Sequence, residues 1–169
     1  MSENANANNE LVLRCQWEAY MECGAGETKK YHLVGEGFTT FPEAKNPKEY
    51  TRKYVNNKTE KTDVIGYSPS ISYSVDCITG EPCVQEVVEI HEKEYVGTAT
   101  HRNIVSVNCW DEKSDGEYAA TKRTFAIIPS NKGDGTDALI YTGTMKAVSD
   151  IEHGTFNRET KVFTPLAAE

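Results

Sequence analysis

The sequence has few of the features that mark exported or membrane-bound proteins. No apolar run approaches the length of a membrane span. The first nine residues, Met1–Asn9, have neither a basic start nor an apolar core, so we expect no signal peptide. The five cysteines are odd in number and form no Cys-x-x-Cys pair, and without an export signal we expect reduced thiols. These absences argue against a secreted, disulfide-linked or membrane-spanning protein.

Motifs for catalysis and cofactor binding are also missing. The stretch Glu89–Glu94 resembles half of a His-Glu-x-x-His zinc motif, but Tyr95 stands where the second histidine belongs. Gly24–Lys29 has two glycines and a lysine without the Gly-Lys-Ser/Thr ending of a phosphate loop, and a hairpin turn explains it fully. The four histidines carry no flanking signature of a Cys–His nucleophile. We therefore predict no enzyme, no catalytic residue, no cofactor and no metal.

The charge balance is acidic. The 169 residues contain 18 Lys and Arg against 26 Asp and Glu, for a net charge of -8. This length fits one domain with a substantial core. An acidic domain repels a phosphate backbone, so we do not expect a tight nucleic-acid binder. The same charge suits a surface along which nucleic acid passes without adhering.

Alternation of apolar and polar residues dominates the chain and predicts β-structure. The clearest case is the run in which Ile71, Tyr73 and Val75 point one way and serines point the other. A turn is expected at 66–69, and Gly143 is expected to mark a bulge. We predict a mainly β fold, a β-sandwich or partial barrel. The expected strands are 10–21, 30–34, 71–75, 102–110, 118–128, 139–148, 151–156 and 161–164.

One helix is predicted, over residues 82–95, flanking the sheet. Pro82 suits the first helical position, and Gly97 suits the stop. An apolar stripe at helical spacing should face the sheet, and His91 on that stripe should be a packed side chain. The stripe consists of Val84, Val87, Val88, His91 and Tyr95.

A long loop over residues 39–63 stands out between these elements. It shows little periodicity, and Pro42 and Pro47 should exclude regular pairing. Loops of this length are uncommon in compact domains unless they have a role. The segment from Pro42 to Asp63 contains six basic and four acidic residues, so its net charge is +2. The rest of the chain then has a net charge of -10.

A basic loop on an acidic body is suited to contact between identical subunits. A solvated surface loop with ordinary charge scatter is an equally open interpretation. The residues that we expect at an intersubunit contact are Phe41, Lys45, Lys48, Tyr50, Arg52, Lys53, Tyr54, Lys58 and Lys61. We divide the chain into a flexible N-terminal arm (1–10), a single β domain (11–164) and a C-terminal tail (165–169), and expect both ends to be extended.

Several segments in order resemble the bacteriophage tail tube proteins, including the tubes of phage-tail-like particles. The resemblance covers most of the chain after about residue 10. The segments are Tyr54–Glu60, Gly66–Tyr73 with Asp76, Thr79–Pro82 leading into the helix, Tyr141–Thr144 and Gly154–Thr164.

The resemblance implies a structural protein of the virion, assembled in the host cytoplasm, with no catalysis. Subunits would form hexameric rings whose strands join into a continuous inner barrel, and rings would stack into a hollow tube. The 39–63 loop would reach an adjacent ring, and an acidic lumen would conduct DNA into the host. Implied partners are other copies of the chain, a tape measure protein, tail tip or terminator proteins, and in contractile tails a sheath.

Two other classes of function stay open at this stage. The first is a monomeric β-sandwich module that binds carbohydrate or protein through Trp17, Trp110 and tyrosines. The second is a thiol enzyme that uses one of the five cysteines.

Overall fold

The computed structural model describes residues 9–167, and this range is mainly β. Strands make up 53% of it, with one α-helix, as the sequence predicted. Residues 1–8 of the proposed N-terminal arm and 168–169 of the C-terminal tail lie outside the described residues. The tail begins later than expected, because Pro165 belongs to the last strand and the Leu166 amide donates a hydrogen bond to the His153 carbonyl (2.9 Å).

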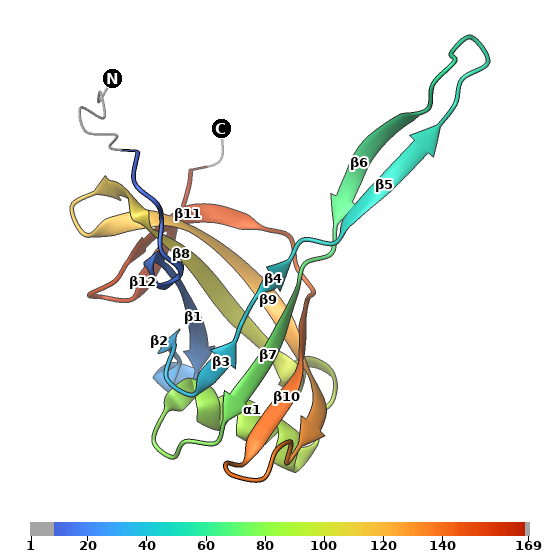
Figure 1. Cartoon of the computed structure of the whole chain (residues 1–169). Coiled ribbons are helices and arrows are strands. Elements are labelled where there is room, and N and C mark those ends of the chain that lie inside the picture. The colour runs from blue at the N-terminus through green and yellow to red at the C-terminus, as the bar shows by residue number, and fades with distance from the viewer. Residues whose placement is uncertain (1–8, 168–169) are drawn as a thin grey trace.

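Ten strands form one antiparallel sheet that curls into a half-barrel (Figure 1). Its main path runs β2-β1-β8-β9-β10-β7-β3, with β4 also on β7. The long strand β9 has two partners along one edge, β11 beside its first half and β10 beside its second half. The strands are β1 (Trp17–Cys23), β2 (Lys30–Val34), β3 (Phe38–Thr40), β4 (Glu43–Ala44), β7 (Ser70–Asp76), β8 (His101–Ser114), β9 (Glu117–Lys132), β10 (Ile140–Ala147), β11 (Glu152–Asn157) and β12 (Val162–Pro165).

The strand β7 confirms the predicted alternation. Ile71, Tyr73 and Val75 are at most 2% exposed in the main core, whereas Ser72 is exposed on the other face. A one-residue shift in pairing would exchange these two faces, so the pattern itself specifies the register.

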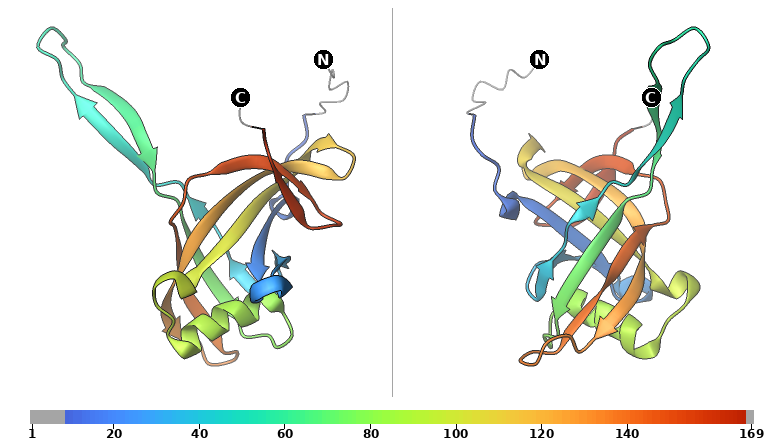
Figure 2. Two further views of the ribbon diagram at one scale, coloured as in Figure 1. Left: turned by 180° about the vertical axis from the view of Figure 1, so that it is seen from behind. Right: turned by 45° about the vertical axis from the view of Figure 1, so that its right-hand side comes forward.

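Helix α1 (Pro82–Lys93) lies across one end of the half-barrel (Figure 2). The helix ends two residues earlier than predicted, because Glu94 adopts a left-handed conformation (φ 50°) at the C-cap. Its buried stripe is Cys83, Val84, Val87 and Ile90, so Val88 and Tyr95 pack only at the margin. His91 is a packed side chain that shares a 2.7 Å hydrogen bond with the Tyr73 hydroxyl.

A second, smaller core lies on the opposite face of β1, β8 and β9. The β11–β12 hairpin covers this face and contributes Phe156, which is fully buried. The Phe156 ring lies 4.5 Å from the ring of Tyr20 and meets Tyr31 edge-on at 6.0 Å. The sheet therefore has apolar residues on both faces, which is the sandwich component of the fold.

Several predicted boundaries are wrong at the strand ends. The first strand was expected from residue 10, but a 3-10 turn at Arg14–Gln16 delays it to Trp17. The strand expected over 102–110 is longer in the structure, because pairing continues to Ser114 and leaves Asp115 and Gly116 at the corner. Gly116 supplies the positive φ (76°) that this tight turn requires.

Gly143 is the bulge that the sequence predicted, since the β9–β10 register shifts between Thr142 and Gly143. A Cβ at this position would lie 2.7 Å from Cζ of Tyr73 and nearer still to the Ile128 carbonyl. We expect Gly143→Ala to lower the free energy of unfolding by about 1–3 kcal/mol through overpacking. Urea denaturation with Gly66→Ala as the control, where a Cβ meets nothing within 4 Å, tests this; equal stability of the two variants would contradict it.

Candidate assembly interface

Residues 47–67 form a β-hairpin arm that projects from the body of the protein (Figure 1). The arm pairs β5 (Pro47–Arg52) with β6 (Lys61–Tyr67) in a two-stranded sheet of its own. The prediction of an irregular loop over 39–63 is therefore wrong. The turn expected over 66–69 is shorter, because β6 continues to Tyr67 and only Ser68 and Pro69 separate it from β7. Pro47 is tolerated because it is the first residue of an edge strand, and Pro42 falls between β3 and β4.

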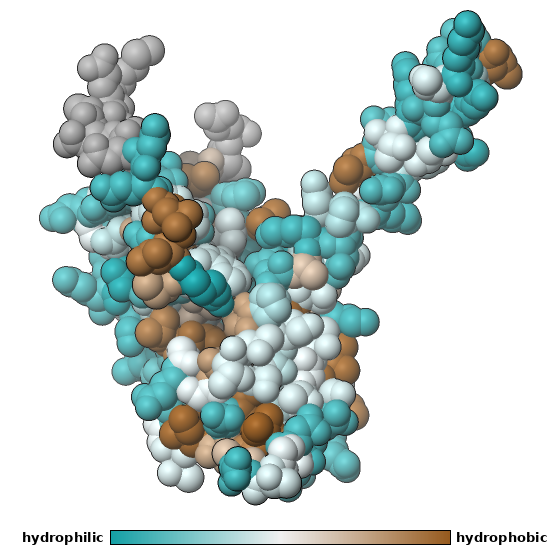
Figure 3. Space-filling model, in the orientation of Figure 1, coloured by the Kyte–Doolittle hydropathy of each residue, from teal (hydrophilic) through white to brown (hydrophobic). Residues whose placement is uncertain are grey.

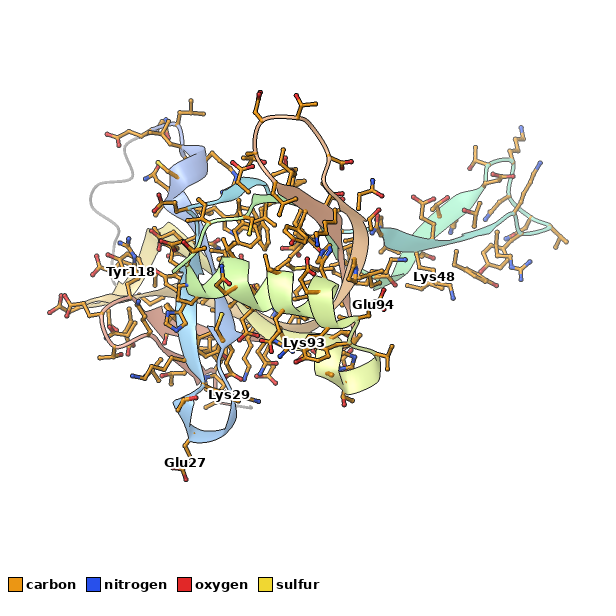
Figure 4. All side chains as sticks on the ribbon, turned by 90° about the horizontal axis from the view of Figure 1, so that it is seen from below. Glu27, Lys29, Lys48, Lys93, Glu94 and Tyr118 are labelled. Carbon is orange, nitrogen blue, oxygen red and sulfur yellow. The ribbon has the colours of Figure 1, made fainter. Side chains whose placement is uncertain are left out.

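The structure brings most of the predicted contact residues together on this arm. Lys48, Tyr50 and Arg52 lie on β5, and Lys61 lies on β6. Figure 4 shows Lys48 on the part of the arm nearer the body. The three remaining arm residues, Lys53, Tyr54 and Lys58, are at the tip between the strands.

Two predicted contact residues are not on the arm. Phe41 is 7% exposed in the main core, where its ring meets Phe38 edge-on at 5.7 Å. The prediction that Phe41 lies on a contact surface is therefore wrong. The chain pairs with β7 through β3 and β4 before the arm begins, and this pairing places Phe41 in the body. Lys45 lies at the root of the arm and is ion-paired with Glu43 at 2.8 Å.

One face of the arm combines aromatic and cationic groups. Cross-strand pairing places Tyr50 opposite Asp63 and Arg52 opposite Lys61, and these four side chains share a face. The Arg52 Nε donates a 2.6 Å hydrogen bond to the Tyr50 hydroxyl, and the guanidinium carbon lies 4.9 Å from the ring centroid. Tyr–Arg clusters of this kind are enriched at the energetic centres of protein interfaces.

Sequence reasoning missed the apolar residues of β6. Val64, Ile65 and Tyr67 are 53%, 56% and 60% exposed. Figure 3 shows hydrophobic patches on the otherwise hydrophilic arm. The local signal was the β-branched pair Val64–Ile65 with Thr62 and Tyr67 nearby, residue types that favour a strand over a loop.

The arm has no hydrophobic core of its own among the described residues. An isolated two-stranded hairpin is marginally stable in water, and both of its outer edges present unpaired backbone groups. Long exposed edges and apolar side chains promote association with another chain. The arm therefore has the features of a segment that a partner covers.

The root of the arm is held to the sheet by polar contacts. The Asn46 side-chain amide donates hydrogen bonds to the Ser68 carbonyl (3.1 Å) and the Ser70 hydroxyl (2.9 Å). Asn46 has a positive φ of 46°, a conformation that asparagine tolerates better than most residues. These contacts set the direction in which the arm leaves the body.

Two of the cysteines and one histidine lie in packed settings. Cys23 and Cys83 are buried with their sulfur atoms 3.7 Å apart. The hydrogen bond that Cys23 donates to the Cys83 sulfur, together with burial, raises the pKa of the Cys23 thiol, which disfavours the nucleophilic thiolate. Burial lowers the pKa of His91 and so favours its neutral form in the contact with Tyr73. Within residues 9–167, no group of three or more His, Cys, Asp or Glu is arranged to hold a metal ion.

No helix in the described part of the chain is long and apolar enough to span a membrane. No family model and no curated protein matches the sequence. A solved structure with a similar arrangement of the chain is a component of the anti-feeding prophage baseplate, determined by cryo-electron microscopy with six-fold symmetry. The likeness has a TM-score of 0.45 and 9% sequence identity, and covers 90% of this chain and 97% of that one.

Proposed function

We propose that this protein is a structural subunit that self-assembles into hexameric rings stacked as a hollow phage tail tube. In this proposal it belongs to the virion, is assembled in the host cytoplasm, and acts neither as an enzyme nor as a cofactor carrier. The proposal rests on the ordered sequence resemblance to tail tube proteins and on the exposed arm.

The arm is the observation that carries the proposal. A two-stranded hairpin with exposed Tyr50, Ile65 and Tyr67 is costly to maintain in a monomer. Contact with an adjacent ring would cover these side chains and pair or shield the free edges. The cationic tip, with Lys53 and Lys58, would then approach the acidic body of a neighbouring subunit.

The charge of the body supports passage of DNA. Residues 42–63 have a net charge of +2, so the rest of the chain has a net charge of -10. A tube lined by such subunits repels phosphate groups and releases no counterions on contact, so DNA slides without adhesion. A tape measure protein inside the tube, tip or terminator proteins at its ends, and a sheath in a contractile tail complete the proposed set of partners.

Negative-stain electron microscopy of the purified full chain tests this function directly. We expect six-fold rings or long hollow tubes at high protein concentration. A chain that stays monomeric across salt and concentration would contradict self-assembly. A monomer whose melting temperature rises with a carbohydrate or protein ligand would instead favour the binding-module alternative.

A further inference from the structure

A groove of about 570 Å³ lies between β2 and the turn that leads into β12, away from the arm. Residues distant in the sequence form it: Lys29 and Lys30 beside or on β2, Lys122 on β9, and Lys161 before β12. The only acidic residue among its lining residues is Glu22. Four lysines and one glutamate give the lining of the groove a net charge of +3. The rest of the chain therefore has a net charge of -11.

Ion pairs within the described residues do not neutralise these ammonium groups, although Glu152 of β11 lies opposite Lys122 in the sheet. None of the four lysines takes part in an ion pair among the described residues. Lys122 lies 5.9 Å from the centroid of the Phe163 ring, and burial together with Lys161 and Lys30 lowers the pKa of His32. Like charges held together in this way attract an anionic partner.

Hydrogen bonds order the turn at residues 157–161, which carries Lys161 of the groove. Lys161 has a positive φ of 57°, and its amide donates a 2.7 Å hydrogen bond to the Asn157 carbonyl. The Asn157 side-chain oxygen accepts hydrogen bonds from the amides of Glu159 and Thr160 at 2.9 and 3.0 Å. A side chain on an ordered turn loses less entropy on binding than one on a mobile loop.

An acidic element of complementary charge exists on the same chain. The tip of the β8–β9 hairpin, residues 111–117, has four carboxylates and one lysine, for a net charge of -3. Strand β1 pairs with β8 only as far as Asn108, so the β8 side of the tip has no outer strand beside it, whereas Glu117 on the β9 side pairs with Asn157 of β11. The tip protrudes at the upper left of the molecule in Figure 1.

We propose that this groove binds the acidic β8–β9 tip of a second copy of the chain. The contact is heterologous, because a tip on one subunit meets a groove on the next, and so it can propagate an assembly. This inference rests on the proposed self-assembly and adds a second contact, independent of the arm. DNA is the less suitable occupant, because a duplex that reaches the groove also approaches a subunit whose remaining residues carry a net charge of -11.

Charge exchange in the full-length protein tests the contact. We expect Lys161→Glu or Asp115→Lys alone to weaken self-association by about tenfold or more, since each places like charges together. The double variant Lys161→Glu/Asp115→Lys should recover most of the affinity. Lys146→Glu is the matched control, because Lys146 is equally exposed but lies outside the groove and should leave association unchanged. Sedimentation velocity measures the affinities, and the melting temperature checks that each variant is folded.

The outcomes separate this contact from the proposed function. Rings that form with unchanged affinity in Lys161→Glu would overturn the groove contact and leave the tail tube proposal standing. A wild-type protein that never associates would overturn both. Binding of a short DNA duplex that Lys161→Glu abolishes, with self-association unaffected, would assign the groove to nucleic acid and also overturn the contact. Failure of the double variant to recover affinity would exclude a direct pairing between tip and groove.

Discussion

Replacing residues 48–66 by Asn-Gly is expected to give a folded protein that no longer stacks into tubes. The replacement keeps the cross-strand pair Pro47–Tyr67 and closes it with a two-residue turn that suits a hairpin. Because the arm contributes no residue to either core, the melting temperature should stay within about 2 °C of wild type. Electron microscopy and thermal unfolding of the same preparation measure the two effects.

The shorter replacement matters because removal of all of 39–63 would also damage the body. That segment includes part of β3 and all of β4, which pair with β7, and Phe41 of the main core. A matched variant, Lys53→Ser/Lys58→Ser, retains the hairpin and removes two tip charges. If stacking depends on charge, this variant should stack weakly and lose its salt dependence. Normal tubes from the arm replacement would show that the arm has no role in stacking.

Phe156→Ala is expected to have the largest effect on stability of any single substitution discussed here. The side chain is fully buried between Tyr20 and Tyr31, and its removal leaves a cavity beneath the β11–β12 hairpin. Truncation of a buried phenylalanine lowers the free energy of unfolding by about 3–5 kcal/mol. Urea denaturation at constant ionic strength gives this value directly.

Val162→Ala is the control for this substitution. Val162 is on the same hairpin but is 54% exposed, so its truncation should change stability by less than about 0.5 kcal/mol. The hairpin has a second attachment in Arg158, which makes two hydrogen bonds to Glu18 at 2.7 and 3.1 Å. A loss below about 1 kcal/mol in Phe156→Ala would mean that these polar contacts, and not the second core, hold the hairpin.

The sequence predicted the strands that alternate cleanly and the position of the helix. In β7 and β10, burial follows the period of two, and Gly143 marks the bulge. Predictions were wrong where the position of a residue in the folded structure, and not its local sequence, decided its conformation. Pro47 suggested a loop because proline interrupts a paired strand, yet an edge strand outside the main sheet accommodates it.

The candidate contact residues were found through their charge, not through their structure. The excess of lysine and arginine between Pro42 and Asp63 identified the arm, and seven of the nine predicted residues are on it. Phe41 was misplaced because an isolated aromatic residue in an aperiodic stretch gives no sign of burial. The exposed apolar residues of β6 were missed because Tyr67 was assigned to a turn, while Val64 and Ile65 fell between the predicted loop and turn and were assigned to no element.

By itself, the sequence determined the acidic charge, the basic segment, and the alternation that makes β-strands, since all three are properties of neighbouring residues. Only the tertiary structure decided that the arm is a hairpin standing away from the body, that the sheet has two cores, and that one groove gathers four lysines. Lys29, Lys122 and Lys161 meet because β2, β9 and β12 are arranged around β1 and β11. Such pairings join residues far apart in the chain, and no local pattern records which strands become neighbours.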